Sequence, residues 1–339
     1  MTLLKILLIG FGFVAGSLVR TIHQKIEAVK QVDKDFSVIG VSDTEGYVLW
    51  EEGLSLEKLS RISGTSDYSE HFVVNGSSLE LIEKSDADIM IEATPTNIRD
   101  GEPGLTFIKN ALTLGINVVT ANKGPLVVAF RDLKNLAEAK RCEFRFEGTV
   151  AGAMPVFSLV NECLQGDRIV KISGILNGTT NFILSKMYFE GTSFEIALKE
   201  AQERGITEKD PSYDVDGIDA ACKVVILANA VMDRDARFED VEKVGIRGIT
   251  PEAVSLAKRS NYAIKLIGTV DKAIEVAPKL VPVNHPLCVH GTLNALHFDT
   301  DLARELTLVG YGAGKETVSA LLNDLISILK RRAAPAQHA

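Results

Sequence analysis

The residues best suited to chemistry lie between positions 208 and 223, where several acidic side chains precede one lysine. The segment reads Glu-Lys-Asp-Pro-Ser-Tyr-Asp-Val-Asp-Gly-Ile-Asp-Ala-Ala-Cys-Lys and is followed by the apolar run Val224 to Val231. A run this apolar cannot all face water, so we expect a largely buried helix that begins near Gly217. Asp219 and Lys223 are four residues apart and would share one face of that helix.

Two interpretations of this segment are open. The pair could be an ordinary exposed salt bridge, which contributes little. Alternatively, Glu208, Asp210, Asp214 and Asp216 precede the helix in a loop that contains a proline. Loops on rigid elements often carry binding groups, so these carboxylates could bind a small molecule that bears a cation.

A glycine-rich turn near the N-terminus predicts a dinucleotide site. The buried strand Leu3 to Ile9 leads through Gly10-Phe11-Gly12-Phe13-Val14-Ala15 into a helix that runs to about Val32. Gly10 permits the tight turn, Gly12 lets backbone approach a pyrophosphate, and Ala15 allows close packing of helix on strand. The N-terminus of the helix offers free N–H groups to the anion.

The next strand, Phe36 to Ser42, ends at Asp43. An acid at this position typically bonds the adenosine ribose and repels a 2′-phosphate, and no arginine follows it directly. We therefore expect NAD(P) binding with a slight preference for NAD, although Lys58 could permit use of both cofactors.

Two further strands should bring polar groups to the carboxyl edge of the same sheet. Ala87 to Ala93 ends at Thr94, and Ile116 to Thr120 is followed by Asn122-Lys123-Gly124. Ligands of open α/β sheets bind at this edge. Lys123 is thus either a solvated turn lysine or a residue between the cofactor and the substrate loops.

The alternation of strands and helices up to about residue 150 predicts an α/β fold of the Rossmann type, with a doubly wound parallel sheet. A second α+β domain should follow. Residues 168–176 form a β-rich run, and strands at 241–249, 262–270, 273–281 and 291–298 should form one antiparallel sheet. Asn177 to Asn181 would open a helix whose free amides suit a carboxylate. Another helix is expected at 316–329, and residues 331–339 should form a flexible tail.

The composition favours a small-molecule partner. The 339 residues carry a net charge of -8 without a basic cluster before the last few residues, which argues against nucleic acid. The four cysteines are far apart and signal neither zinc nor disulfides. No apolar run is long enough for a signal peptide or a membrane span, so we expect a cytoplasmic protein.

Several motifs occur together in one order along nearly the whole chain. They are Gly10-x-Gly12-x-x-Ala15, Thr120-Ala121-Asn122-Lys123-Gly124, Glu147-x-Thr149-Val150, Asn177-Gly178-Thr179-Thr180-Asn181, Glu208 with Asp214, Asp216-Gly217-x-Asp219-x-x-x-Lys223, and Gly312-Ala313-Gly314. In this the chain resembles homoserine dehydrogenase. That family interconverts L-homoserine and L-aspartate 4-semialdehyde with NAD(P), a step toward threonine, methionine and isoleucine.

The resemblance implies roles for individual residues. Lys223 would be the general acid and base, with Lys123 in support, and the substrate would bind to Glu208, Asp214, Asp219, Asn177 and Thr179. The expected cofactor-binding residues are Gly10, Phe11, Gly12, Phe13, Val14, Ala15, Asp43, Thr94, Lys123, Gly205, Gly312 and Gly314. Glu147 and the backbone at Val150, Gly152 and Met154 would bind sodium or potassium, unless this small-residue turn is only a domain hinge.

The resemblance also implies a domain organisation. Residues 1–149 would bind the nucleotide and be completed by the C-terminal segment 310–330, and residues 150–309 would bind substrate and form a homodimer. Many relatives carry a kinase or a regulatory domain that this chain lacks, so threonine feedback through such a domain is not expected. Another amino-acid dehydrogenase and a nucleotide-sensing protein without turnover are the alternatives. Aspartate-semialdehyde dehydrogenase is disfavoured because no cysteine is placed as a nucleophile.

Overall fold

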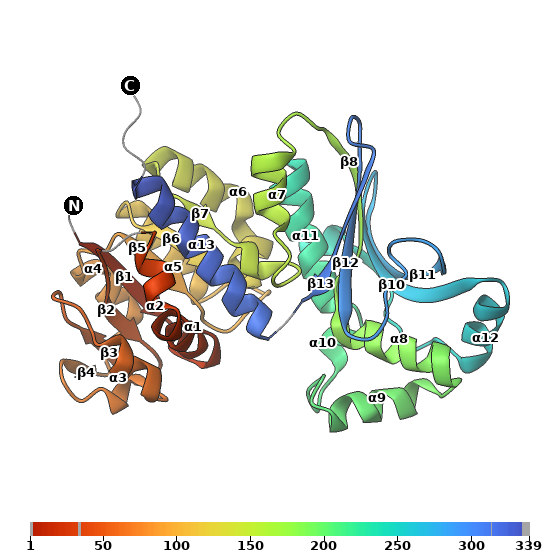
Figure 1. The fold of residues 1–339 in the computed structure, drawn as a ribbon, viewed down its shortest axis with the longest axis horizontal. Helices are drawn as coiled ribbons and strands as arrows, with labels where there is room; N and C mark the ends of the chain where they lie inside the picture. The colour runs from red at the N-terminus through yellow and green to blue at the C-terminus, as the bar shows by residue number, and fades with distance from the viewer. Residues whose placement is uncertain (1–2, 33–34, 313, 334–339) are drawn as a thin grey trace. The chain divides into compact units, whose positions relative to one another are not determined.

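The computed structural model describes residues 3–32, 35–312 and 314–333 (Figure 1). The chain forms two compact units, which we describe one at a time. The first comprises Met1–Thr149 and Gly314–Ala339, and the second comprises Val150–Ala313. The first unit is therefore built from two separate parts of the chain.

The first unit contains a seven-stranded sheet in the order β4-β3-β2-β1-β5-β6-β7. The strands are β1 (Leu4–Ile9), β2 (Phe36–Ser42), β3 (Gly46–Leu49), β4 (Phe72–Val74), β5 (Ile89–Glu92), β6 (Asn117–Thr120) and β7 (Phe144–Arg145). All neighbours pair in parallel except β2 with β3 and β3 with β4. The predicted Rossmann-type sheet is confirmed, with an antiparallel extension that we did not predict. Strand order reverses between β1 and β5, where open α/β sheets bind ligands.

Helices cover both faces of this sheet. They are α1 (Phe13–Gln24), α2 (Ile26–Lys30), α3 (Leu56–Arg61), α4 (Ser78–Lys84), α5 (Gly104–Thr113), α6 (Lys123–Lys140) and α13 (Lys315–Ala333), with short 3-10 turns η1 (Thr65–Asp67) and η2 (Glu147–Thr149). Along β1, Leu4, Ile6 and Leu8 enter one core, whereas Leu7 and Ile9 enter the other. Burial on both faces explains why these strands read as continuous apolar runs.

The helix α13 returns from the C-terminal part of the chain to the first core. Val318, Leu321 and Leu325 are buried there among side chains of α1 and β1. The helix continues to Ala333, and Arg331 Nη1 donates to Glu143 Oε1 at 2.6 Å. Residues 331–333 are thus helical, although we expected the flexible tail to begin at residue 331. Residues 334–339 of that tail lie outside the described residues.

The second unit contains a six-stranded sheet in the order β13-β12-β8-β10-β11-β9. Its strands are β8 (Ile169–Ile175), β9 (Glu242–Lys243), β10 (Tyr262–Val270), β11 (Ile274–Pro282), β12 (Leu293–Thr300) and β13 (Glu305–Tyr311). Neighbours are antiparallel except β9, which pairs in parallel with β11. The strand predicted at 241–249 is wrong beyond Lys243, because the chain turns there toward a helix.

The helices of the second unit are α7 (Val156–Cys163), α8 (Gly178–Glu190), α9 (Phe194–Glu203), α10 (Ser212–Val215), α11 (Ile218–Met232) and α12 (Pro251–Arg259), with the 3-10 turn η3 (Phe238–Asp240). The predicted buried helix near Gly217 corresponds to α11. Val224 to Asn229 of this helix are all buried. Both α8 and α11 contact β10 in the middle of the sheet.

A lysine lies inside this second core. Lys265 on β10 is only 1% exposed, and its Nζ lies 2.8 Å from Asn181 Oδ1, 3.3 Å from Ser185 Oγ and 3.3 Å from His290 Nδ1. These partners are neutral acceptors, and within the described residues no carboxylate forms an ion pair with Lys265. Burial lowers the pKa of Lys265 to about 8.

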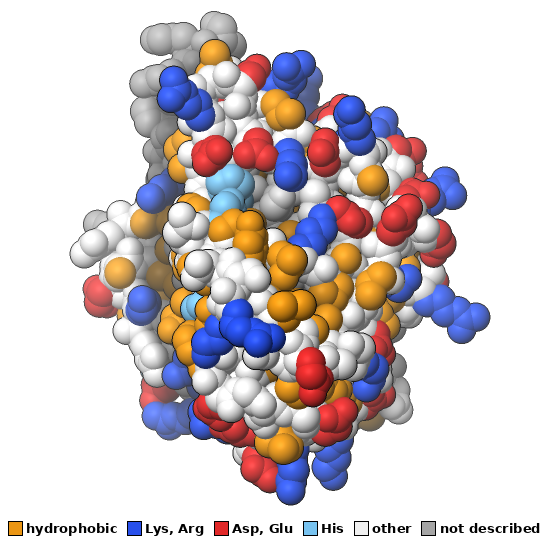
Figure 2. Space-filling view, turned by 90° about the vertical axis from the view of Figure 1, so that its right-hand side faces the viewer, with side chains coloured by type: hydrophobic (Ala, Val, Ile, Leu, Met, Phe, Trp, Pro, Cys, Tyr) orange, Lys and Arg blue, Asp and Glu red, His pale blue; other side chains and the backbone are white. Residues whose placement is uncertain are grey.

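The surface combines apolar and charged groups. Figure 2 shows a face on which apolar side chains gather in the central part, among charged side chains of both signs. On the strands of the second unit, Leu280, Val309 and Tyr311 are large apolar side chains that remain exposed. The four cysteines are free thiols. Among the helices in the described ranges, none combines the length and the apolar character needed to cross a membrane.

Candidate active site

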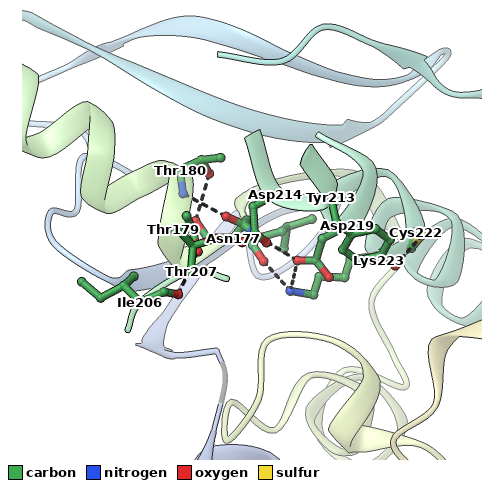
Figure 3. A network of polar contacts seen from close by, with 11 residues as sticks. Asn177, Thr179, Thr180, Ile206, Thr207, Tyr213, Asp214, Asp219, Cys222 and Lys223 are labelled. Atoms are coloured by element: carbon green, nitrogen blue, oxygen red, sulfur yellow. Dashed lines mark hydrogen bonds and ion pairs between the residues drawn. The ribbon is translucent and has the colours of Figure 1, made fainter. Parts of the chain in front are cut away.

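In the second unit, one asparagine brings two carboxylates together (Figure 3). Asn177 is the N-cap of α8, and its Oδ1 accepts a hydrogen bond from Thr180 N at 2.9 Å. Its Nδ2 donates to Asp214 Oδ1 at 2.6 Å and to Asp219 Oδ2 at 3.0 Å. The cap of α8 therefore also orients acidic side chains of α10 and α11.

Lys223 completes this cluster from the second turn of α11. Its Nζ donates to Asp219 Oδ2 and to the carbonyl oxygen of Leu176, each at 2.7 Å. Lys223 is 7% and Asp219 is 6% exposed. The interpretation as an exposed salt bridge is therefore wrong. An ammonium group has three N–H donors, so one remains for a further partner.

The start of α11 explains how the sequence holds this pair. Gly217 adopts φ 79°, a left-handed conformation that favours glycine, and it is the N-cap of α11. From there the apolar run buries the helix, and Asp219 and Lys223 follow one above the other on its first turns. The local turn and the helix period together place the ion pair.

Only some of the carboxylates before α11 meet in the cluster. Asp214 also accepts from Thr207 Oγ1 at 3.0 Å. Asp216 instead forms an ion pair with Arg247 Nε at 2.5 Å, and Asp210 accepts from Ser212 N. Glu208 is exposed, and within the described part of the chain its carboxylate makes no hydrogen bond or ion pair. Asp210 and Asp216 thus make their bonds outside the network of Asn177, Asp219 and Lys223, whereas Asp214 belongs to it.

Neighbouring groups close the cluster on other sides. Thr179 Oγ1 donates to the carbonyl oxygen of Ile206 at 3.3 Å, just after Gly205, which ends α9 with φ 66°. The Tyr213 hydroxyl lies 3.5 Å from Cys222 Sγ. Burial and the nearby acidic groups raise the pKa of Tyr213, so its hydroxyl stays neutral.

Two contributors to the cluster were missed in the sequence. A backbone carbonyl such as that of Leu176 has no sequence signal. Thr207 precedes Glu208 directly, so its position beside the acidic segment was the available clue.

In the first unit, the glycine turn has the shape that a dinucleotide needs. Gly10 adopts φ 87°, and a Cβ there would lie 2.8 Å from Thr94 N. At Gly12 a Cβ would meet nothing within 4 Å, so the backbone is open to a ligand. No side chain caps α1 and its first turn has no acid. These features fit the binding of a pyrophosphate at the helix N-terminus.

The remaining residues of this turn divide between core and surface. Phe11 and Ala15 are buried in the core beside β1, whereas Phe13 is exposed and Val14 is half-buried. Gly10 N and Phe11 N both donate to the carbonyl oxygen of Ser42, which precedes Asp43. The turn is thereby tied to the end of β2.

Asp43 is already engaged by its own chain. Its Oδ1 accepts from Thr65 Oγ1 at 2.6 Å and from Glu45 N at 2.8 Å, and its Oδ2 accepts from Thr65 N at 2.7 Å. Each carboxylate oxygen can accept more than one bond. Lys58 forms an ion pair with Glu70 at 3.2 Å. Asp43 thus lies at the predicted strand end, held in a fixed orientation.

The ends of β5 and β6 carry a polar network around Glu92. Its carboxylate accepts from Thr94 N at 2.9 Å, Thr120 Oγ1 at 2.6 Å and Asn122 Nδ2 at 3.3 Å. Asn122 is also the N-cap of α6, with Oδ1 3.0 Å from Gly124 N, and Lys123 is the first residue of that helix. The network fixes the backbone from which Lys123 projects, and sequence reasoning had missed Glu92.

The residues expected to bind a monovalent cation are divided between the two units. Glu147 belongs to the first unit and is buried, and its N donates to Asp324 Oδ2 at 2.9 Å. Burial, followed by the charge of Glu147, raises the pKa of Asp324 to about 7. Val150, Gly152 and Met154 belong to the second unit, where Gly152 adopts φ 59°.

The closing glycine motif is described only in part. A Cβ at Gly312 would lie 2.1 Å from Asn294 Nδ2, so any larger residue there would have to displace the Asn294 amide. Gly314 adopts φ 85° and precedes α13. Ala313 lies outside the described residues.

Comparisons with known proteins bear on the whole chain. The family model of homoserine dehydrogenase matches residues 155–326. Homoserine dehydrogenase of Methanocaldococcus jannaschii is 43% identical over 96% of this chain and 98% of its own length. NAD(+)-dependent homoserine dehydrogenase of Pseudomonas canavaninivorans is 36% identical over 100% of this chain and 99% of its own.

Solved structures agree with these sequence relatives. A crystal structure of an Archaeoglobus fulgidus protein superposes with a TM-score of 0.89 at 41% identity, covering 96% of this chain and 99% of that one. A hyperthermophilic archaeal homoserine dehydrogenase in complex with NADPH superposes with a TM-score of 0.80 at 30% identity, covering 98% of each chain.

Proposed function

The chain belongs to the homoserine dehydrogenase family, and from this premise we propose how its own residues interconvert L-homoserine and L-aspartate 4-semialdehyde. The enzyme is an NAD(P)-dependent oxidoreductase, and its reaction is a step toward threonine, methionine and isoleucine. The observation that carries the proposal is the buried network of Asn177, Asp214, Asp219 and Lys223. A bound nicotinamide supplies the hydride chemistry, so the protein must hold the amino acid and move one proton.

We assign the substrate ammonium to the carboxylates of Asp214 and Asp219, joined by Glu208 from its exposed loop. The first two are preoriented by the same Asn177 amide, which supports a shared partner. The substrate carboxylate would then bind at the N-terminus of α8, where the amides around Thr179 are favourable for an anion.

We assign proton transfer to Lys223. Asp219 and the Leu176 carbonyl take two of its N–H groups, so the third position on Nζ faces the substrate: as the ammonium it gives this proton to the aldehyde oxygen, and as the neutral amine it takes the proton of the substrate hydroxyl. Asp219 then orients Lys223 and contributes to substrate binding. Lys123, at the start of α6, is given a supporting role near both ligands.

For the cofactor, the open backbone at Gly12 and the uncapped N-terminus of α1 support pyrophosphate binding. The carboxylate of Asp43 would bond the ribose and favour NAD over NADP. Relatives use both forms, since one is named NAD(+)-dependent and another was solved with NADPH. Gly205, Gly312 and Gly314 remain proposed members of the cofactor site.

A monovalent cation at Glu147 and the carbonyls of Val150, Gly152 and Met154 is a further proposal. Two buried carboxylates, Glu147 and Asp324, lie close enough to raise the pKa of Asp324, and a cation would relieve their repulsion. Replacing sodium and potassium by a bulky organic cation should lower activity. Unchanged activity would rule out a required ion.

We also infer a homodimer formed through the sheet of the second unit. The exposed apolar side chains Leu280, Val309 and Tyr311 on its strands support an interface there. Light scattering on the purified protein measures the mass directly, and a monomer at micromolar concentration would contradict the inference.

The experiment that tests the function follows reduced nicotinamide by absorbance after mixing enzyme with L-homoserine and either NAD or NADP. We expect turnover with L-homoserine and none with its D-enantiomer, which presents the ammonium on the wrong side. The ratio of kcat/KM for the two cofactors tests the role of Asp43. Cofactor binding without turnover of L-homoserine would instead indicate another amino-acid dehydrogenase or a nucleotide sensor.

A further inference from the structure

Glu92 is a buried carboxylate that the reaction scheme has not used. It is the last residue of β5 and is 0% exposed. Thr94 donates to it through both N and Oγ1, and Thr120 Oγ1 and Asn122 Nδ2 add two more hydrogen bonds. All these donors are neutral, and no Lys, Arg or His of the described chain forms an ion pair with it. A buried carboxylate without a counter-ion is destabilising, so a purely structural role would be poorly served by it.

The charge state of Glu92 depends on two opposing effects. Burial raises the pKa of this carboxyl group, whereas the donated hydrogen bonds act in the opposite direction. A cation brought close to Glu92 would stabilise the ionised carboxylate. The Glu92 carboxyl group is thus either ionised or can be ionised by a nearby cation, and no positively charged side chain of the described residues forms an ion pair with it.

The position of Glu92 indicates where such a cation would come from. The glycine turn is in contact with this network, since a Cβ on Gly10 would lie 2.8 Å from Thr94 N. Asp43, at the end of β2, belongs to the adenosine half of the expected cofactor site. The nicotinamide half then lies over the ends of β5 and β6, on the other side of the switch point.

We propose that Glu92 favours the oxidised, positively charged nicotinamide over the reduced, neutral ring, and that its hydrogen bonds position Thr94 and the Asn122–Lys123 turn around that ring. This proposal rests on the proposed function, because it assumes a nicotinamide cofactor. Its consequence is that the enzyme-bound equilibrium is displaced toward the oxidised cofactor and the alcohol. At the effective dielectric constant of a protein, the loss of one charge from such a pair changes the ratio of affinities on the order of tenfold.

The test compares the dissociation constants of NAD and NADH, and of NADP and NADPH, for the wild type and Glu92→Gln by titration calorimetry. The amide keeps the shape of the side chain and removes the charge. We expect the ratio of oxidised to reduced dissociation constants to rise about tenfold. Asp88→Asn is the matched control, because Asp88 is an exposed carboxylate just before β5, at the opposite end of the strand, and its ratio should not change.

Two further variants keep the proposal falsifiable if Glu92→Gln does not fold. Glu92→Asp keeps the charge and should retain the wild-type ratio. Thr120→Val removes a donor to the carboxylate, so it should shift the ratio in the same direction as Glu92→Gln but less. Equal effects on both cofactor forms would mean a structural role and overturn the proposal. Failure of the proposed function is distinguishable, because it would abolish turnover of L-homoserine while leaving these binding ratios measurable.

Discussion

Replacing Lys223 by arginine separates proton transfer from positive charge at the proposed active site. Arginine can still pair with Asp219, whose Oδ2 lies 2.7 Å from Lys223 Nζ. It cannot lose a proton in a protein, so it cannot act as the base. Loss of general acid–base catalysis lowers kcat by about 10²- to 10⁴-fold, which corresponds to roughly 3–5 kcal/mol of barrier.

Lys223→Met completes this test by removing the charge. Asp219 would then keep the Asn177 hydrogen bond at 3.0 Å but lose its ion pair with Lys223. Breaking a buried pair in this way should lower the free energy of unfolding by about 3 kcal/mol. Urea unfolding would show this loss in the methionine variant and a smaller one in the arginine variant.

The assay is initial-rate kinetics in both directions, together with cofactor binding by titration calorimetry. Cofactor dissociation constants should stay near those of the wild type in both variants, since Lys223 is not among the residues proposed to bind the cofactor. Lys209→Met is the matched control, because Lys209 is an exposed lysine in the same acidic segment. A kcat for Lys223→Arg close to that of the wild type, with an intact fold, would refute the assignment.

Three other predictions follow from the geometry. Gly10→Ala should weaken binding of both cofactors by about tenfold or more in calorimetry, because φ 87° and the close approach to its neighbour exclude a Cβ, whereas Gly16→Ala in α1 should bind normally. Asn177→Ala should raise the KM for L-homoserine. It should also lower the free energy of unfolding in urea by about 1 kcal/mol, because α8 loses its N-cap. An unchanged KM would show that Asn177 does not contribute to substrate binding. Since the pKa of Lys265 falls from 10.5 to about 8 on folding, the unfolded state binds more protons between these values, so stability should rise by up to about 3 kcal/mol from pH 8 to 10.5. Lys265→Met should lack this rise, and parallel pH profiles of the two proteins in urea would contradict the lowered pKa.

The parts of the fold that sequence reasoning found are those with local signals. The strand at the N-terminus is buried on both faces and reads as an unbroken apolar run, and the turn after it needs glycine for steric reasons. The helix that bears Lys223 was found from its apolar run. In each case the physical requirement lies within a few consecutive residues.

The parts that were missed depend on distant partners. Nothing near Asp216 shows that Arg247 will take it out of the acidic cluster. The antiparallel strands β3 and β4 are only four and three residues long, and β4 also exposes Val73 and Val74, so neither gives an apolar run long enough to predict a strand. Glu92 was visible as an acid that ends an apolar strand, and Lys265 as a charge inside one, but only the folded chain identifies their hydrogen-bond partners.

The return of α13 to the first unit has a consequence for the order in which the chain folds during synthesis. Residues 150–313 form a continuous unit and can bury their core as soon as they leave the ribosome. The first core instead waits for Val318, Leu321 and Leu325, so the nucleotide-binding half, although made first, is completed last. Until then the apolar side chains that α13 covers are open to chaperones, and a nascent chain stalled before residue 315 should be more sensitive to protease in its first 149 residues than in the unit that follows.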